Sequence, residues 1–419
     1  MSKKKNKKIN SVVGSYDVLP RDESYYQGIS EAGEKVSELY NFHFIETPPF
    51  EYMDLFNSAG FGEGDLDLKE SLLSFDLNTS KVKKKISLRV NGVIPVMRSY
   101  IENQLGRFAS PLKSYYKGAM FKKNDSGEIS QNHHWGFSII GDGDVFYDIE
   151  IIMAVIDFLS EIKIKDPVIK INSPGCKVCR ASLKKKLKKH YRYKKKNICV
   201  DCKEKYKNDP LGLLGCEKEK CLEIKGEAPT IFNCLCQSCN NHFKEFLELI
   251  EDNGINYIPD PYFMGNLSCY TKIAFKVFSD VESDLELASG GRHDYLSERI
   301  GGRQLQATGG SINVGNVITY LKEKEININP RTRRKLFFVA VGNEAKKSAV
   351  ALIRELRSSS IVVVESLGKR TLNAQLKVAK KSDAKLTLIY GQKEAFEESI
   401  IIRNMKTGAQ ESLPLNKMM

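Results

Sequence analysis

Apolar and polar positions along the chain follow different periods, and each change of period marks a predicted element. Residues 22–40 space their apolar side chains as an amphipathic helix does. Strands are predicted for residues 41–47, 86–90, 114–121 and 134–140, and a second helix for residues 148–162. Strand runs that are joined by loops and followed by a helix indicate an α+β domain on a mostly antiparallel sheet.

The last part of the chain has a different pattern. Continuous apolar runs occur at 336–341, 361–364 and 386–390, and helical stretches separate them at 343–357 and 371–382. Continuous runs are typical of strands that are buried on both faces. Their alternation with helices predicts a compact α/β domain with a largely parallel sheet.

Cysteine chemistry singles out the interval from Cys176 to Cys239, which holds nine of the ten cysteines. Two thiolates of one Cys-x-x-Cys turn can approach the same cation, and two such pairs complete a tetrahedral four-sulfur zinc site. We therefore expect two structural zinc sites, with Cys234 spare. The eight expected ligands are Cys176, Cys179, Cys199, Cys202, Cys216, Cys221, Cys236 and Cys239.

Which cysteines share which zinc ion stays open at this stage. The alternative is a set of buried thiols or disulfides. Core cysteines do not cluster in Cys-x-x-Cys pairs, and no secretory segment precedes these ones. The pattern offers no open coordination position, so the metals are expected to stabilise a small module and to catalyse nothing.

These patterns give the predicted domain organisation. Residues 11–170 and 256–325 form the α+β core, because strand and turn signals resume after the inserted cysteine-rich module at 171–255. A polar, basic linker at 326–334 leads to the α/β domain at 335–419. Residues 1–10 are predicted to be a flexible basic tail.

Composition also indicates the kind of binding partner and the cellular compartment of the protein. The formal net charge of +13 indicates a polyanionic partner, since cations that meet phosphates release counterions. There are nowhere eighteen consecutive apolar residues, so no membrane association is expected. Together with the free cysteines, this indicates a protein of the reducing cytoplasm.

Several segments resemble histidyl-tRNA synthetases, and they follow one another in that family's order over nearly the whole chain. The resemblance is carried by residues 14–20, by the proline motif at 44–51 and by residues 367–376, and the cysteine-rich module resembles one found in a subset of the family. It implies a class II synthetase core, a C-terminal anticodon-binding domain, tRNA as a partner and a homodimer in which Pro48 lies near the subunit contact.

Three arginines that surround the ATP phosphates in the family are replaced. Lys122 stands at the arginine of the second class motif, Asn316 at that of the third, and Gly265 at that of the histidine-specific segment. Lysine keeps a point charge but loses the planar fork that grips phosphate with two bonds. Losing one preorganised donor costs roughly 3 to 4 kcal/mol.

The family's amino-acid pocket has also lost residues that bind the substrate. Asn91 and Val93 replace a glutamate and a threonine that hold the substrate's ammonium group in the family. The other altered pocket positions are His134, Ser138, Ser268 and Cys269. Arg98, Tyr270 and Arg292 are retained.

These substitutions favour a tRNA-binding relative of histidyl-tRNA synthetase with lost or strongly reduced histidine activation. An active histidine–tRNA ligase with an atypical site, using ATP and Mg²⁺, is the first alternative. A protein-binding regulatory paralogue is the second, and it resembles a shorter relative that usually lacks the C-terminal domain.

A lysine-rich run with interleaved tyrosines, at 184–196, is the RNA candidate outside the anticodon-binding domain. Its basic side chains could follow an RNA backbone while its tyrosines stack on exposed bases. A solvated helix surface is the alternative. The residues expected to meet RNA are Lys184, Lys185, Lys188, Arg192, Lys194 and Lys195.

Overall fold

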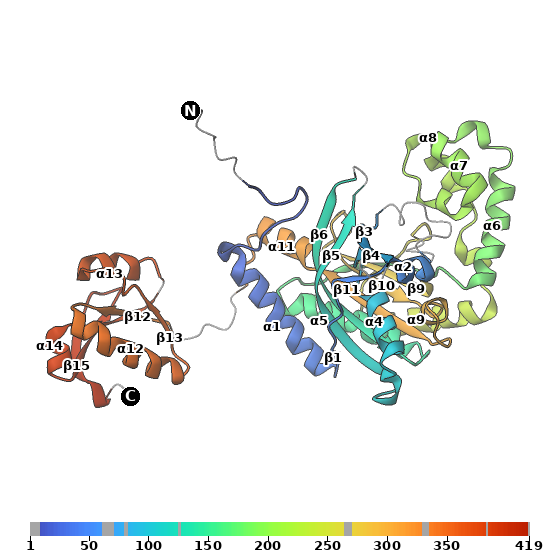
Figure 1. Ribbon diagram of the computed structural model, residues 1–419. Helices are drawn as coiled ribbons and strands as arrows, with labels where there is room; N and C mark the ends of the chain where they lie inside the picture. Colours follow the sequence, from blue (N-terminus) through green and yellow to red (C-terminus); the bar gives the residue numbers. More distant parts are fainter. Residues whose placement is uncertain are drawn as a thin grey trace. The chain divides into compact units, whose positions relative to one another are not determined.

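The computed structural model separates into two compact units, residues 1–330 and residues 331–419 (Figure 1). It describes residues 9–60, 71–78, 83–124, 127–263, 270–328, 335–382 and 384–417. Most of the predicted basic tail and residues 329–334 of the predicted linker lie outside the described residues. No helix in the described part is both long and apolar enough to cross a membrane.

An eight-stranded sheet forms the centre of the first unit, in the order β1-β5-β6-β11-β10-β9-β7-β8. Its strands are β1 (His43–Phe44), β5 (Leu112–Lys123), β6 (Ile129–Ile140), β7 (Val168–Asn172), β8 (Tyr257–Pro259), β9 (Thr271–Phe278), β10 (Glu286–Arg292) and β11 (Ala307–Asn313). The six inner strands are antiparallel, and the two edge strands each pair in parallel. The predicted mostly antiparallel sheet is therefore present.

Helices cover both faces of this sheet and account for most of its packing. They are α1 (Glu23–Leu39), α2 (Met53–Ala59), α4 (Val93–Glu102), α5 (Phe146–Glu161), α10 (Leu296–Arg299) and α11 (Val314–Glu323). The helix predicted for 22–40 is α1, and it ends where Asn41 takes the left-handed conformation, with φ 58°. The helix predicted for 148–162 is α5, which begins two residues earlier.

The strand alternation of β6 separates two cores. Its odd-numbered residues Trp135, Phe137 and Ile139 face the core that α1, α5 and α11 share, whereas Ile140 joins the core under α4. Full burial of one such apolar side chain stabilises the fold by about 1.5–3 kcal/mol. The face of the sheet under α4 also carries three of the predicted site residues, Lys122, His134 and Ser138.

Two smaller groups of elements complete the first unit. A three-stranded sheet is formed by β2 (Phe50–Tyr52), β3 (Ser74–Asn78) and β4 (Lys83–Leu88). Between β7 and β8, the cysteine-rich segment folds into α6 (Lys177–Tyr191), α7 (Val200–Asn208), α8 (Glu219–Gly226) and α9 (Gln237–Asp252). Helices α6, α7 and α8 lie together, away from the large sheet (Figure 1).

The second unit is a five-stranded α/β domain in the order β13-β12-β14-β15-β16. Its elements are β12 (Lys335–Ala340), α12 (Asn343–Ser358), β13 (Val362–Glu365), α13 (Leu372–Ala379), β14 (Leu386–Tyr390), α14 (Gln392–Phe396), β15 (Ser399–Asn404) and β16 (Gln410–Pro414). The first three strands in this order are parallel, as the continuous apolar runs predict. β15 and β16 add an antiparallel hairpin that the sequence analysis did not anticipate.

Candidate functional site

Two groups of four cysteines could each hold a metal ion. One contains Cys176, Cys179, Cys236 and Cys239, and the other contains Cys199, Cys202, Cys216 and Cys221. Within each group, all four sulfur atoms lie within 4.8 Å of one another. The first Cys-x-x-Cys pair therefore shares its site with the last one, a grouping that the sequence left open. Cys234 belongs to neither group and is buried.

The sulfur geometry of both groups fits a tetrahedral ion. Four sulfurs that each lie about 2.3 Å from a central zinc ion are separated by about 3.8 Å. The Sγ–Sγ distance is 3.8 Å between Cys176 and Cys236, and 3.9 Å between Cys199 and Cys216. Distances of this size are too long for a disulfide bond, in which the sulfurs are about 2.05 Å apart.

Backbone N–H groups support the thiolates of both groups. The Cys236 N–H donates to the Cys179 Sγ over 3.1 Å, and the Cys199 N–H donates to the Cys221 Sγ over 3.2 Å. Burial alone would raise the pKa of Cys176, but hydrogen bonds from the backbone of Cys179 and Val178 outweigh it and lower the pKa to about 7. The loops thus favour the deprotonated, metal-binding form at Cys176 and Cys199, whereas burial raises the pKa of Cys179 and Cys221.

Helix α6 turns its apolar stripe to the module core and its lysines to solvent. Leu183, Leu187 and Tyr191 are buried together with cysteines of both groups. The expected RNA residues Lys184, Lys185, Lys188, Arg192 and Lys195 are exposed. The sixth, Lys194, is half-buried and forms an ion pair with Glu227.

The prediction that the tyrosines of this run stack on bases is wrong for Tyr191. Its side chain is only 1% exposed, because it lies on the same stripe as the buried leucines. Tyr193 is 85% exposed, and the Arg192 guanidinium lies over its ring at 5.6 Å from the centroid. Tyr193 is therefore the tyrosine of this run that is available to a base.

The face of the large sheet under α4 gathers one predicted phosphate-binding position, Lys122, and two predicted pocket positions, His134 and Ser138. In the β5–β6 register, Lys122 lies opposite Ser130, His134 opposite Gly118 and Ser138 opposite Ser114. These pairs are separated by even numbers of residues, so Lys122, His134 and Ser138 lie on one face. The positive charge of Lys122 is close enough to His134 to help lower the pKa of that imidazole.

Tyr116 covers the middle of this face. Its ring fills the space above Gly136, where a Cβ atom would lie only 2.1 Å from the phenol carbon Cζ. The Tyr116 side chain is 2% exposed, and burial raises its pKa to about 12. Glycine at 136 is therefore required for the ring to lie flat on the strand.

His134 is held by a neighbouring strand. Its Nδ1 atom lies 2.8 Å from the Ser311 hydroxyl on β11. Burial, with a smaller contribution from Lys122, lowers the pKa of His134 to about 4. This imidazole is therefore neutral at physiological pH, so one ring nitrogen can donate a hydrogen bond and the other can accept one.

Two predicted pocket residues, Arg98 and Asn91, and the predicted phosphate-binding position Asn316 form contacts within the protein. The Arg98 guanidinium forms ion pairs with Glu51 and, at 2.6 Å, with Glu102. The Asn91 side chain accepts a hydrogen bond from the Ile94 N–H at the start of α4. Asn316 donates through Nδ2 to the Glu286 carbonyl oxygen over 2.8 Å.

Arg292 lies at the end of β10 and is fully buried. Its Nη1 atom is 2.9 Å from the Asp148 carboxylate, and its Nη2 atom is 3.3 Å from Asp294. Burial would lower the pKa of Arg292, but the two carboxylates outweigh it and raise that pKa. Arg292 therefore holds the turn after β10 against α5 rather than presenting its charge to a ligand.

Some predicted positions fall at or beyond the edge of the described structure. Gly265, Ser268 and Cys269 lie outside the described residues. Tyr270 is described, and its ring packs against Gly291, since a Cβ atom at that glycine would lie 3.0 Å from the ring. Val93 is half-buried as the first residue of α4.

Two residues that the sequence analysis did not single out complete the polar part of this face. Ser114 lies directly opposite Ser138, and His293 follows Arg292 with its imidazole directed at the space above Gly309. Both are almost fully buried. The alternation of β5 could have indicated Ser114, but the orientation of His293 depends on an irregularity of pairing after Gly291.

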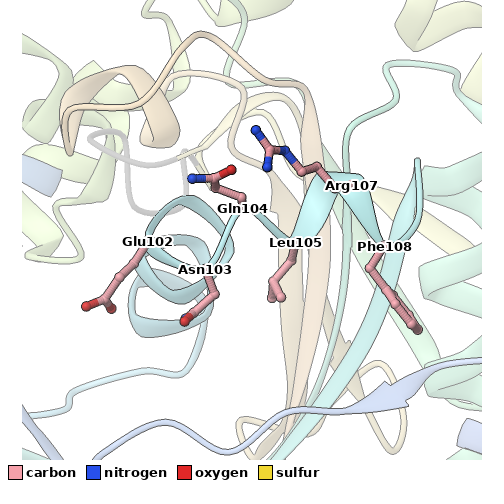
Figure 2. A pocket seen from close by; sticks show the side chains of 6 residues that line it. All are labelled: Glu102, Asn103, Gln104, Leu105, Arg107 and Phe108. Carbon is pink, nitrogen blue, oxygen red and sulfur yellow. The ribbon is translucent and has the colours of Figure 1, made fainter.

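A hollow of about 360 Å³ lies at the C-terminal end of α4, away from these groups (Figure 2). It is lined by Glu102, Asn103, Gln104, Leu105, Arg107 and Phe108. Phe108 is 71% exposed and meets the His43 ring edge-on. None of the predicted site residues lines this hollow.

Comparisons with known proteins cover nearly the whole chain. A family model described as histidyl-tRNA synthetase matches residues 14–190, and one described as anticodon binding domain matches residues 335–419. The histidine–tRNA ligase of Natranaerobius thermophilus is 32% identical over 406 residues, which cover 96% of each chain. That of Thermosipho melanesiensis is 33% identical over 402 residues, or 95% of this chain and 94% of the relative.

A solved structure agrees with these matches. The crystal structure of apo S. aureus histidyl-tRNA synthetase superimposes with a TM-score of 0.80 at 27% identity and covers 98% of each chain. The chain therefore belongs to the histidyl-tRNA synthetase family, with a class II synthetase-like core and a C-terminal anticodon-binding domain.

Proposed function

We propose that the protein is a histidine–tRNA ligase with an atypical active site. The names of its full-length relatives support this function better than the loss of activation that the substitutions alone favour. The observation that carries the proposal is the shared face of Lys122, His134 and Ser138 on the central sheet. The face combines one cation with neutral polar groups, as recognition of ATP and an amino acid requires.

Lys122 is the proposed cation at the reacting phosphate. Amino-acid activation joins the substrate carboxylate to the α-phosphate of ATP and releases pyrophosphate, so negative charge develops on the phosphate oxygens. A lysine ammonium stabilises that charge as a single point charge, whereas an arginine guanidinium would bind the phosphate with two hydrogen bonds. We therefore expect turnover to be slower than in relatives with arginine, by about 10²–10³-fold for each lost donor.

A direct test is aminoacylation by the purified protein. ATP, Mg²⁺, histidine and a matching tRNA are supplied, and histidyl-tRNA is separated from free tRNA on an acidic gel. The proposal expects charged tRNA that disappears when histidine is omitted. No charged tRNA at enzyme concentrations equal to the tRNA concentration would contradict it.

A second candidate is a tRNA-binding protein that does not activate histidine. It is favoured by the internal contacts of Arg98, Asn91 and Asn316, since these side chains are already used by the protein. A protein-binding regulator has less support, because the match to an anticodon binding domain spans the part that such shorter relatives lack. The aminoacylation test separates the first two functions.

The cysteine-rich segment is proposed to be an inserted module that holds two structural zinc ions. Zinc is the metal that best fits four thiolates at tetrahedral spacing. Each ion would tie loops from distant parts of the segment together, which a core of this size needs for stability. Thiolates of this kind persist in a reducing compartment, in line with the cytoplasmic location that we propose.

The exposed cations of α6 are proposed to meet the phosphate backbone of tRNA. Lys184, Lys185 and Lys188 form no ion pair within the described residues, so their charges remain available to phosphate groups. The anticodon-binding domain would supply the other contact with the same tRNA. A homodimer with Pro48 near the subunit contact completes the proposal.

A further inference from the structure

Helix α9 carries two candidate metal ligands and one histidine whose side chain reaches out of the cysteine-rich segment. Cys236 is the N-cap residue of α9, Cys239 lies in its first turn, and His242 follows three residues later. Residues three apart are neighbours on the surface of a helix. His242 therefore lies beside Cys239, one turn further along α9.

The cysteines at the starts of α6 and α9 form one candidate metal site, which we call the α9 group: Cys176, Cys179, Cys236 and Cys239. An ion shared by these thiolates fixes the first turn of α9 against α6. The later turns of α9 are fixed by packing, since Phe246 and Ile250 are fully buried in the core of the large sheet. His242 stands between these two anchors.

The other candidate metal site has no member on α9. We call it the α7–α8 group, and its members are Cys199, Cys202, Cys216 and Cys221. Helices α7 and α8 lie away from the large sheet, whereas α9 packs against it (Figure 1). The α9 group is therefore the one that can fix the position of His242 directly.

His242 donates a hydrogen bond out of the cysteine-rich segment to helix α5. Its Nε2 atom lies 2.8 Å from the Asp148 Oδ2 atom, which also accepts from the Arg292 guanidinium over 2.9 Å. The other carboxylate oxygen, Asp148 Oδ1, is buried and has no hydrogen-bond partner among the described residues. His242 and Arg292 thus hold the carboxylate through one oxygen from two sides. Removing His242 leaves Arg292 alone to orient it.

Arg292 extends this network to the start of strand β9. Its Nη2 atom lies 3.3 Å from the Asp294 carboxylate, and Asp294 accepts a hydrogen bond from the Thr271 hydroxyl over 3.2 Å. Thr271 is the first residue of β9 and pairs with Arg292 in the sheet. All three side chains are buried, so water does not compete for these hydrogen bonds.

Tyr270 connects the network to the substrate pocket. It directly precedes Thr271, and its ring packs against Gly291, where a Cβ atom would lie 3.0 Å from the ring. Gly291 in turn directly precedes Arg292. Since Tyr270 is one of the retained pocket residues, a shift of Thr271 or Arg292 would move a wall of the pocket.

We propose that His242 is a positioning residue that transmits the order of the α9 group to the wall of the pocket at Tyr270. The cysteines fix the start of α9, His242 orients the Asp148 carboxylate, and that carboxylate holds Arg292 and the start of β9 in place. His242 itself touches no ligand. The choice of histidine as the ligand whose binding responds rests on the proposed function, whereas the effect on the strands does not.

Backbone hydrogen–deuterium exchange of the full-length protein, loaded with zinc, measures this positioning. His242→Ala should speed exchange at least about tenfold at the start of β9 and the end of β10. His242→Gln should restore most of the protection, because the glutamine amide can donate to Asp148. His190→Ala is the matched control and should leave both strands unchanged. His190 is a half-buried histidine of the same segment, and its Nε2 atom lies 3.1 Å from the Ile224 carbonyl oxygen.

Metal-ligand variants separate the two cysteine groups. Cys239→Ser should speed exchange of the same strand amides, and adding His242→Ala should have no further effect, because both changes break one path. Cys221→Ser, in the α7–α8 group, should leave these amides unchanged. Mass spectrometry counts the zinc ions of each protein, and His242→Ala should retain both.

Substrate kinetics distinguish positioning of the pocket from a merely structural role. In histidine-dependent exchange of pyrophosphate into ATP, His242→Ala should raise the KM for histidine about tenfold and change kcat less than about twofold. The reason is that Tyr270 borders the amino-acid pocket, whereas Lys122 is the proposed cation at the phosphate. His190→Ala should leave both constants unchanged.

Four results would overturn the positioning role. They are unchanged strand exchange in His242→Ala, equally fast exchange in His242→Gln and His242→Ala, equal responses to Cys239→Ser and Cys221→Ser, and an unchanged KM for histidine in His242→Ala. Failure of the proposed ligase function gives a different pattern. The strand amides would then still respond to His242→Ala, while wild-type protein shows no exchange of pyrophosphate into ATP.

Discussion

The Asp148 carboxylate on α5 lies 2.9 Å from the Arg292 guanidinium at the end of β10, and neither side chain is more than 1% exposed. The same carboxylate oxygen is 2.8 Å from His242 Nε2 on α9. One buried acid therefore connects the turn beside the pocket, a helix behind the sheet and the last helix of the cysteine-rich segment.

Removing this acid should destabilise the first unit. Asp148→Ala leaves the Arg292 charge buried with only Asp294 beside it, and breaking a buried pair costs about 3–5 kcal/mol. Urea unfolding of the two proteins measures the difference. Glu248→Ala, which breaks the exposed Lys244–Glu248 pair, is the control and should cost less than about 1 kcal/mol. Equal losses in both variants would contradict the role of the buried pair.

Each of the two cysteine groups should hold one zinc ion, independently of the other group. Cys239→Ser should release one of two zinc ions per chain, Cys221→Ser should release the other, and Cys234→Ser should keep both, because Cys234 belongs to neither group. Elemental analysis by mass spectrometry after gel filtration gives the counts. Loss of both ions from either single variant, or of one from Cys234→Ser, would disagree with two independent four-sulfur sites.

Exposed lysines of α6 should contribute to the salt dependence of tRNA binding. Lys184→Ala with Lys188→Ala removes two cations that face solvent one turn apart, so the slope of log K against log salt should fall by about 1 to 2. A filter-binding series from low to high salt measures it. The control removes Lys35 and Lys244, which are already paired with Glu161 and Glu248. A slope that changes equally in both double variants would point to net charge rather than to a contact.

Acidification should weaken the fold through its buried histidines. The pKa of His293 is lowered to about 4 by burial, whereas an unfolded histidine has a pKa near 6.5. Between these values the unfolded chain binds the extra proton, so stability is complete above pH 6.5 and falls as the pH drops toward 4. One such group accounts for about 2 kcal/mol between pH 7 and pH 5.

The variant His293→Phe isolates that contribution. Its free energy of unfolding should change less between pH 7 and pH 5 than that of wild type, because one buried titrating group has been removed. Urea unfolding of wild type and variant at pH 7 and pH 5 measures the four free energies of unfolding. An identical pH dependence in the two proteins would show that His293 is protonated equally in the folded and unfolded states.

Periodicity predicted the long helices and several strands but missed the β15–β16 hairpin. The amphipathic pattern located α1, and the apolar runs located β5, β6, β12 and β14. The hairpin of β15 and β16 escaped because β15 is only partly buried along most of its length. β16, the strand at the edge of this sheet, has no buried residue and therefore carries a weak apolar signal.

The candidate site shows why side-chain neighbours are harder to predict than elements. Spacing alone indicated eight metal-binding cysteines, but the grouping of Cys176 with Cys236 depends on how α6 and α9 come together. Likewise, Ser114 and Ser138 meet through strand register, which is a tertiary property. The burial of Tyr191 depends on the apolar stripe of α6, which the many lysines of this run conceal at the level of sequence.

Histidine-dependent exchange of pyrophosphate into ATP tests the central claim most directly, since it reports activation without tRNA. Lys122 and Lys123 are neighbours on β5 with opposite orientations, so Lys123→Ala is a matched control for Lys122→Ala. The proposed ligase predicts slow exchange in wild type and in Lys123→Ala, and a loss of about 10²-fold or more in Lys122→Ala. No exchange above the rate without histidine, or exchange that Lys122→Ala leaves unchanged, would contradict it.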